Sequence, residues 1–552
     1  MKVKSIIKCP KGVSKCILSV FLILMQALPA QTPPELKVLV SPDFSSPFGF
    51  VLKSPLDVKD GYIQTSSKDN DELFCFQKFS KDLKLQKTNT VSIKDRLNAK
   101  NKYERFIQTK NKIYLLTREV HNEEHTEGVS ALEFFPDQLE LSANSVSLFQ
   151  SSDKVAVNRG TYDYFLSGDK TKLLITYRMV PKIRSSNSNK DMIGMFVFDE
   201  KLKKLWGDEF EMPYPELMMQ IIDYTVSTDG KIFMTIKVFE NDSRDDAERD
   251  GSISNHLELL VFEKNKKKPT KIEIGLQHNF YKNAYVFEDG NKKLCVAGLY
   301  SSVNSVEVNG VYMATFPLEK WNFSEDNPVK KTEAILYGIP TAICESANSA
   351  MSINSTNTLN RLQLRDIELM EDGSIKILTE EFRAKFNTII KKMDGFDPYT
   401  YNYYKGYQFD PPHMTHAYSG DIYIFSIDKN ERLEWVKRIP KYQHRSDGDY
   451  RPLSFSTLVF EDNLYVFFLD TKKNDNIQET GRAKQYHGRS KYGYLRGVSI
   501  DKQGNTRKFD AGYRKIRAID FFIRFFKAGN NNNLYFVERT ARNNVLYVIQ
   551  PD

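Results

Sequence analysis

The chain has 552 residues, of which 40% are hydrophobic, and 79 Lys and Arg against 71 Asp and Glu give it a formal net charge of +8. Five of the positive charges, Lys2, Lys4, Lys8, Lys11 and Lys15, lie in the first 30 residues, which contain no acid, so the rest carries 8 − 5 = +3. So small a net charge gives no reason to expect a nucleic-acid partner, which requires a concentrated basic face.

Residues 1–30 are predicted to be a secretory signal peptide and not part of the fold. The lysines precede an apolar run over Ile17–Met25, and Ala30 suits cleavage before Gln31. The run is too short to span a bilayer, which disfavours the alternative of an uncleaved anchor. We therefore expect an exported protein that is periplasmic, associated with the outer membrane or extracellular, with no transmembrane segment in the mature chain.

Two of the five cysteines lie within this predicted signal peptide. The other three, Cys75, Cys295 and Cys344, are an odd number and too few for a disulfide framework. Cys75 and Cys295 lie inside apolar stretches, which predicts that they are small core residues and not nucleophiles.

A tight turn between two apolar stretches recurs along the remaining chain, mostly at intervals of about sixty residues. The stretch Leu369–Pro440 is the fullest copy and reads as strand, turn, strand, insert, strand, turn, strand, which is one four-stranded antiparallel sheet. The turns that mark the first hairpin of each copy are Asp60-Gly61, Lys110-Asn111, Gly168-Asp169, Asp229-Gly230, Asp289-Gly290, Asp372-Gly373, Asp462-Asn463 and Gly529-Asn530.

A second landmark supports the same repeat. Asp199 precedes Trp206 by the same seven positions that separate Asp428 from Trp435, in what reads as the hairpin between the third and fourth strands. We expect these tryptophans to fill space between neighbouring sheets and not to line a site.

Repeated four-stranded sheets, each too small to bury its own faces, are what a β-propeller requires. The last copy supplies only three strands, and the strand Glu35–Ser41 has no copy of its own. We therefore predict an all-β chain in which residues 31–552 form an eight-bladed propeller, with seven blades as the alternative, and in which the N-terminal strand closes the ring.

Two segments of this pattern, GDIYIFSIDKNERLEWVKRIPKYQ and FEDNLYVFFLDTKKND, resemble uncharacterised exported β-propeller proteins of Gram-negative bacteria, within the broad WD40-like and quinoprotein-like repeat class. The resemblance implies the fold and an envelope location, and it implies little about chemistry. Both tryptophan hairpins lack the glycine of the D-x-x-G-x-x-x-W pattern of that class.

Long inserts fall repeatedly between the second and third predicted strands, and in a propeller these connections leave on one face. Such a concentration favours a binding surface over tolerated padding. The inserts are His121–Gly128, Pro181–Asp191, Asn241–Asn255, Ser301–Asn309, 382–419 and 471–492.

The insert at 382–419 carries the predicted contact site, because it gathers aromatic rings in a segment too polar for the core. The alternative is that the loop buries its own rings against its blade. The predicted binding residues are Tyr399, Tyr401, Tyr403, Tyr404, Tyr407, Phe409, His413, His416 and Tyr418.

His413 and His416 have the spacing of a metal half-site, but no third ligand is near, so no metal is predicted. The acidic loop Asp242–Asp250 has interleaved arginines and lacks the residue order of a calcium loop, so it is interpreted as a solvated turn.

The sequence contains no GxSxG, HExxH, GxxxxGK[ST] or CxxC motif. We therefore expect a non-catalytic module, without a cofactor, that binds a protein or glycan of the bacterial envelope. Carboxylates of a glycosidase come from distant strands, so a carbohydrate-active enzyme with carboxylates at the channel mouth stays open as the alternative. A propeller that holds a quinone is a third possibility.

Overall fold

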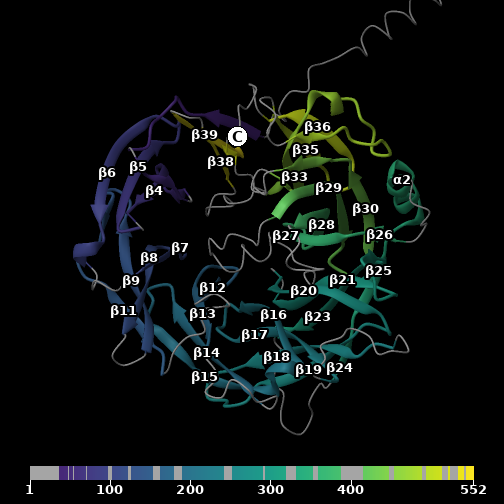
Figure 1. Cartoon of the computed structure of the whole chain (residues 1–552), viewed down its shortest axis with the longest axis horizontal. Coiled ribbons are helices and arrows are strands. Elements are labelled where there is room, and N and C mark those ends of the chain that lie inside the picture. The colour runs from purple at the N-terminus through teal and green to yellow at the C-terminus, as the bar shows by residue number, and fades with distance from the viewer. Residues whose placement is uncertain are drawn as a thin grey trace, which may run out of the picture.

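The computed structural model shows a ring of small antiparallel sheets that stand side by side around a channel (Figure 1). Within the described residues the sheets form eight blades, which confirms the predicted fold class and decides against seven. The structure describes residues 36–47, 49–53, 55–69, 71–96, 102–121, 126–152, 162–179, 189–241, 252–289, 292–318, 331–351, 358–386, 414–446, 453–487, 493–511, 520–521, 533–539 and 543–552.

The first four blades are built, from the channel outwards, in chain order. Blade one is β2 (Val51–Leu52) and β3 (Leu56–Val58), then β4 (Gly61–Lys68), β5 (Leu73–Ser80) and β6 (Leu85–Ser92), followed by η1 (Lys94–Arg96). Blade two is β7 (Lys102–Gln108), β8 (Ile113–His121) and β9 (Thr126–Phe135), with β10 (Glu140–Leu141) and β11 (Val146–Gln150) both on β9. Blade three is β12 (Asp163–Leu166), β13 (Lys172–Arg178), β14 (Lys190–Asp199) and β15 (Lys204–Pro215), followed by η3 (Glu216–Met218). Blade four is β16 (Met219–Val226), β17 (Ile232–Phe239), β18 (Asn255–Phe262) and β19 (Thr270–Gly275), with β24 (Lys331–Glu333) parallel at its edge.

The other four blades follow the same plan. Blade five is β20 (Phe280–Glu288), β21 (Lys293–Ser301), β23 (Gly310–Pro317) and β25 (Ile335–Gly338); α2 (Thr341–Met351) comes next, and β22 (Glu307–Val308) pairs with β26 (Leu359–Asn360). Blade six is β27 (Leu362–Leu369), β28 (Ile375–Phe386), β29 (Met414–Ile427) and β30 (Leu433–Ile439), extended by β31 (Gln443–Arg445) and β34 (Tyr486–His487). Blade seven is β32 (Ser456–Phe460), β33 (Asn463–Asp470), β35 (Tyr494–Ile500) and β36 (Thr506–Asp510), with η5 (Lys472–Asn474) after β33. Blade eight is β37 (Asp520–Phe521), β38 (Leu534–Arg539), β39 (Asn544–Pro551) and β1 (Leu36–Val40).

The two ends of the chain close the ring, as predicted. Strand β1 pairs antiparallel with β39, with Leu36 opposite Pro551 and Val40 opposite Tyr547. A bridge between Phe44 and Asn544 continues the contact beyond β1. Blade eight therefore contains the first and the last strand of the described chain.

The predicted repeat landmarks take the expected places. The turns at Asp60-Gly61 and Asp372-Gly373 join first and second strands, as do their counterparts in the other blades, apart from Gly290 and the turn at 529–530, which lie outside the described residues. Trp206 and Trp435 each reach from one blade to the next. The Nε1 atom of Trp206 donates to the carbonyl of Gly230 at 2.8 Å, and that of Trp435 donates to the carbonyl of Lys502 at 3.1 Å.

In the part of the chain that the structure describes, the hydrophobic core lies between neighbouring blades. One cluster joins Leu378 and Ile424 of blade six to Val466 and Val498 of blade seven, and the other clusters join other neighbours in the same way. Cys75 and Cys295 are fully buried in the strands of their blades and are free thiols, which confirms that they are core residues. Stability therefore depends on every blade having two neighbours.

The insert predicted to begin at Phe382 and end at Ser419 is shorter than expected, because both of its ends are strands. β28 continues to Phe386 and β29 begins at Met414. The physical reason is that Phe382 and Ala417 pack together with Leu453 in a small core of their own, beyond a bulge between Glu380 and Phe382. The predicted insert at 471–492 is likewise partly ordered, since it contains η5 and β34.

Residues 1–30, with the predicted signal peptide, and the acidic loop from Asp242 lie outside the described residues. In the described ranges, no helix combines the length and apolar character needed to cross a membrane.

Candidate functional site

The candidate site is a small extension of blade six on the insert-bearing face. Antiparallel blades send every connection between second and third strands to the same side of the ring, and β28 and β29 run on past their blade in that direction. Short strand β31 pairs antiparallel with β29, and β34 pairs parallel with β31. The result is a four-stranded platform at the base of the longest insert.

One face of this platform carries a row of flat side chains, here called the Tyr–His ladder, which consists of Arg383, Tyr418, His444 and His487. Each residue lies directly opposite the next on the neighbouring strand. The ring of His444 is stacked on that of Tyr418 with centroids 4.4 Å apart, and Arg383 lies 5.6 Å from the Tyr418 centroid on the other side. His487 meets His444 edge to face at 6.1 Å. Tyr418 and His444 are half-buried, whereas Arg383 and His487 are exposed.

His416 adds a fourth ring beside the ladder. Its Nδ1 atom lies 3.0 Å from Nε2 of His444, and the two imidazoles are stacked at 5.3 Å with only 4° between their planes. One of these nitrogens must accept the hydrogen that the other donates, so the contact requires at least one of the two rings to be neutral.

The underside of the platform is held by a buried charge cluster. The carboxylate of Glu380 accepts from Arg365 Nε at 2.9 Å and lies 2.8 Å from Lys441 Nζ, and all three side chains are completely buried. Ser419 and Ser454 also donate to Glu380, at 2.5 and 2.8 Å. Burial lowers the pKa of Lys441, while Glu380 acts in the opposite direction. Four side chains that converge on one buried carboxylate make the platform rigid.

A second ion pair ties the platform to its surroundings. Arg438 Nε donates to Asp421 at 2.7 Å, and Nη1 donates to Ser346 of α2 at 2.9 Å and to the carbonyl of Glu479 at 3.2 Å. The Asp421 carboxylate also accepts from the backbone N–H of Lys441 at 2.8 Å. These bonds connect α2, blade six and the insert at 471–492.

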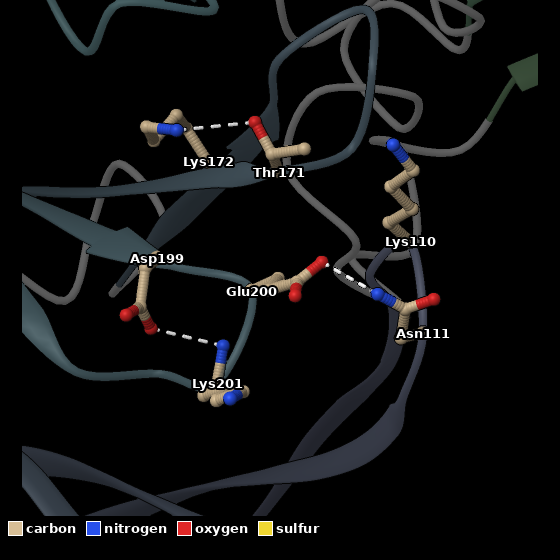
Figure 2. Close-up of a pocket in the computed structure, with 7 residues that line it drawn as sticks. All are labelled: Lys110, Asn111, Thr171, Lys172, Asp199, Glu200 and Lys201. Carbon is tan, nitrogen blue, oxygen red and sulfur yellow. Dashed lines mark hydrogen bonds between the residues drawn. The ribbon is translucent and has the colours of Figure 1, made fainter.

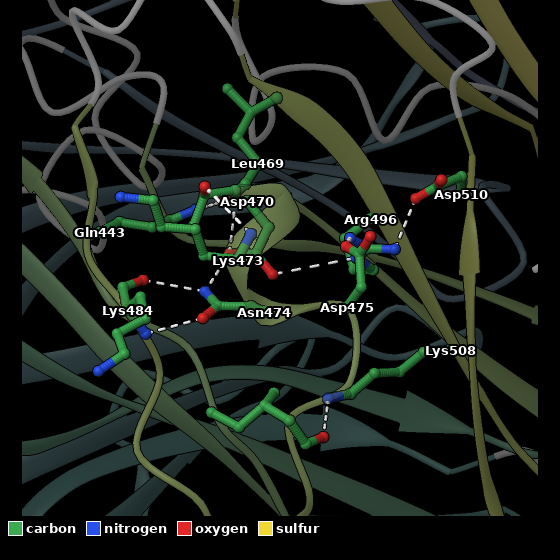
Figure 3. Close-up of polar contacts among 12 residues, drawn as sticks. Gln443, Leu469, Asp470, Lys473, Asn474, Asp475, Lys484, Arg496, Lys508 and Asp510 are labelled. Atoms are coloured by element: carbon green, nitrogen blue, oxygen red, sulfur yellow. Dashed lines mark hydrogen bonds and ion pairs between the residues drawn. The ribbon is translucent and has the colours of Figure 1, made fainter.

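The insert that carries His487 is pinned down by polar contacts, shown in Figure 3. The side-chain amide of Asn474 donates to Asp470 at 2.6 Å and to the carbonyl of Lys484 at 2.9 Å, and its oxygen accepts from the backbone of Lys484. Nearby, Arg496 pairs with Asp475 and with Asp510. These contacts fix the chain just before β34 and so place His487 at the end of the ladder.

Of the predicted binding residues, the structure places His416 and Tyr418 together, at the ladder. The remaining ones, Tyr399, Tyr401, Tyr403, Tyr404, Tyr407, Phe409 and His413, lie outside the described residues. Sequence reasoning missed Arg383, His444 and His487. His444 and His487 lie in short strands outside the repeat pattern, and no motif in the sequence marks them.

One carboxyl group near the platform has unusual chemistry. Burial, reinforced by the carboxylate of Asp421, raises the pKa of Glu381, and the hydroxyl of Tyr423 donates to it at 2.9 Å. A carboxyl group that keeps its proton at neutral pH can act as a general acid. Among the described residues, no cluster of three or more His, Cys, Asp or Glu side chains could hold a metal ion.

The opposite face, which carries the tight turns, has a hollow of about 470 Å³ between blades two and three (Figure 2). Polar side chains line it, but several of them bond to one another. Asn111 donates to Glu200 at 2.9 Å, and the backbone of Lys201 donates to Asp199 at 2.9 Å. The hollow is thus a seam between turns, and the ladder is the better candidate for a binding site.

No protein-family model matches this sequence, and no curated protein matches it. Similar solved structures include the β-propeller domain of the Trilobed protease from Pyrococcus furiosus, at 10% identity and a TM-score of 0.35, covering 86% of this chain and 99% of that one. The WD40 domain of SCAP from fission yeast is similar at 9% identity and a TM-score of 0.35, and the match covers 93% of this chain and 98% of that one. The NanB sialidase from Streptococcus pneumoniae is similar at 9% identity and a TM-score of 0.33, and the match covers 94% of this chain and 95% of that one. These values carry no conclusion about function.

Proposed function

We propose that this protein is an exported, non-catalytic β-propeller that binds a glycan or protein of the bacterial envelope on its insert-bearing face. The observation that carries the proposal is the Tyr–His ladder at the base of the longest insert. Export rests on the signal-like residues 1–30.

The chemistry of the ladder favours a glycan with acidic groups. The half-buried rings of Tyr418 and His444 cover each other's faces, so what they offer a sugar is their edges and the Tyr418 hydroxyl, held in place at low cost in conformational entropy. The guanidinium of Arg383 is suited to a carboxylate, which it can bind with two hydrogen bonds. Because the underside of the platform is fixed by Glu380 and Lys441, little ordering is required on binding.

The test removes the insert and keeps the platform. Purified protein and a variant lacking residues 400–413 are titrated with polygalacturonate, alginate and neutral dextran by calorimetry. We expect the intact protein to bind an acidic polysaccharide, and the deletion to weaken that binding at least tenfold while the melting temperature stays nearly unchanged.

Equal binding by both proteins would reject the insert as part of the site, and absence of binding by both would reject the ladder as a glycan site. If the polysaccharides do not bind but a purified envelope protein does, and only with the insert present, the partner is a protein and the site is retained.

A second function, a carbohydrate-active enzyme, is favoured by one observation, the raised pKa of Glu381. Incubation with the same polysaccharides distinguishes the two. Release of reducing ends that Glu381→Gln abolishes would establish catalysis, and binding without release supports the non-catalytic module.

A further inference from the structure

Asp57, on the innermost strand of blade one, has a buried carboxylate with few polar partners. The residue is 2% exposed, and among the described residues neither Oδ1 nor Oδ2 accepts a hydrogen bond of regular geometry, although the Tyr535 hydroxyl and the backbone N–H of Val58 favour its ionised form. No ion pair joins it to a lysine or arginine in the described part of the chain. The equally buried Glu380 shows the contrast, because it accepts bonds from an arginine, a lysine and two serines. Ionising a buried carboxylate without a cationic partner costs several kcal/mol of folding free energy. We therefore expect such a carboxylate where a bound ligand supplies the partner.

This carboxylate lines a hollow of about 230 Å³ at the seam where blade eight meets blade one, here called the seam hollow. Tyr62, Asn533 and Gln550 also line it. The hydroxyl of Tyr62 donates to Gln550 Oε1 at 2.7 Å, and its ring meets that of Tyr535 edge to face at 5.3 Å. The walls therefore offer a carboxylate, amide groups and the edge or face of a phenol ring to a small guest.

The charges around Asp57 come from several elements. The exposed Lys59 and Lys81 stand at the rim of the hollow, and Lys170 lies in the turn before β13. Burial raises the pKa of Asp57 to about 6, while the Tyr535 hydroxyl and the Lys170 ammonium act against it. The carboxyl is thus ionised at neutral pH. The buried end of the hollow is anionic and its rim is cationic.

We propose that the seam hollow binds a small zwitterionic amine, of which an α-amino acid is the simplest form. The ammonium group of the guest donates to the carboxylate oxygens of Asp57 and contacts the ring of Tyr62, as cations do at aromatic faces. Its carboxylate faces Lys59 and Lys81. Since the walls come from blades one and eight, the guest also joins the two blades at the closure of the ring.

The site lies among the tight turns, on the face opposite the inserts, and does not depend on the glycan proposal. The experiment measures the melting temperature of the full chain at pH 7.5 with millimolar glycine, L-alanine, L-serine and L-glutamate. Methylamine and acetate are tested separately, because methylamine carries only the ammonium group of the guest and acetate carries only its carboxylate. We expect at least one amino acid to raise the melting temperature with a saturating dose dependence, methylamine to raise it less, and acetate to have no effect.

The matched variants are Asp57→Asn and Asp60→Asn, because Asp60 is an exposed aspartate three positions away that does not line the hollow. Asp57→Asn should abolish the shift and Asp60→Asn should retain it. In the unaltered protein the apparent affinity should fall about tenfold per pH unit below pH 6, as Asp57 takes up its proton. This second readout needs no variant.

No shift with any of the amino acids, an equal shift in Asp57→Asn, or an equal shift with acetate would each overturn the proposal. So would an affinity that does not change between pH 7.5 and pH 5.

Discussion

Tyr418 and His444 stack face to face at 4.4 Å across strands β29 and β31, with 16° between their rings. They lie directly opposite one another in the register of the two strands, where cross-strand pairs interact most strongly. With Arg383 on one side and His487 on the other, this stack is the centre of a continuous row.

Replacing the central imidazole should therefore interrupt the row. We expect His444→Asn to weaken binding of an acidic polysaccharide about tenfold, because an aromatic pair contributes about 0.5–1.5 kcal/mol and His444 stacks on two rings. Calorimetric titration measures the effect. His278→Asn, a change at an exposed histidine outside the platform, is the control, and equal losses in both variants would contradict a role for the ladder.

The buried cluster below the ladder should be essential for stability. Glu380→Gln leaves the cations of Arg365 and Lys441 buried without their carboxylate, so we expect the free energy of unfolding to fall by about 3–5 kcal/mol. Urea unfolding followed by fluorescence measures it. Glu333→Gln removes a carboxylate from an exposed pair with Lys331 and should cost at most about 1 kcal/mol. Similar values for the two variants would refute the distinction.

Ring closure can be tested on two neighbouring residues of β1. Leu36 is buried among residues of blades seven and eight, whereas Lys37 is exposed. Leu36→Ala should lower the free energy of unfolding by about 2–5 kcal/mol through the cavity that it leaves. Lys37→Ala should change it by no more than about 0.5 kcal/mol. Chemical denaturation measures the free energy of unfolding of both variants. A Leu36→Ala variant as stable as the unaltered protein would mean that β1 contributes little to ring closure.

Two glycines in equivalent turns should respond in opposite ways to alanine. Gly61 has φ +147°, and an added Cβ would lie 2.0 Å from the carbonyl oxygen of Phe79. Gly168 has nothing within 4 Å of such an atom. We expect Gly61→Ala to cost more than about 1 kcal/mol, and Gly168→Ala to be neutral or to stabilise by up to about 1 kcal/mol. Thermal unfolding distinguishes them, and the reverse order would contradict the turn geometry.

The pKa of Asp57 predicts an unusual pH dependence in the absence of a guest. Because its folded-state pKa of about 6 lies above the ordinary value of 3.8, the folded chain holds a proton that the unfolded chain releases. Stability is therefore lost as the pH rises from about 4 to about 6. Relative to the unaltered protein, Asp57→Asn should gain about 2–3 kcal/mol over this range. Urea unfolding of both proteins at pH 4.5 and pH 7 measures the difference in their free energies of unfolding. The same difference at both pH values would disprove the prediction.

The ring was predictable from the sequence because its determinants are local. Turn pairs such as Asp372-Gly373 and the alternation of apolar residues in each copy specify hairpins, and the unpaired strand at Glu35–Ser41 could only complete the last blade. The ladder was not predictable in the same way. His444 and His487 meet through a parallel pairing of two short strands that no local pattern specifies.

The buried charge cluster could not be predicted from the sequence for a different reason. Glu380, Arg365 and Lys441 are charged residues that sequence patterning assigns to the surface, and only their mutual pairing allows them to be buried. The insert was predicted to begin at Phe382 because its charged residues obscure the strand period. The apolar contact between Phe382 and Ala417 could be recognised only once the two strands were aligned.

The pairing of β1 with β39 has a consequence for how the molecule matures. Residues 36–40 are made before every other strand that the structure describes, yet the strand they dock against spans residues 544–551, so they must wait as an unsatisfied edge until β39 has been synthesised. The circle can be fastened only at the end of that process. A chain that stopped before residue 544 would then be left as an open arc.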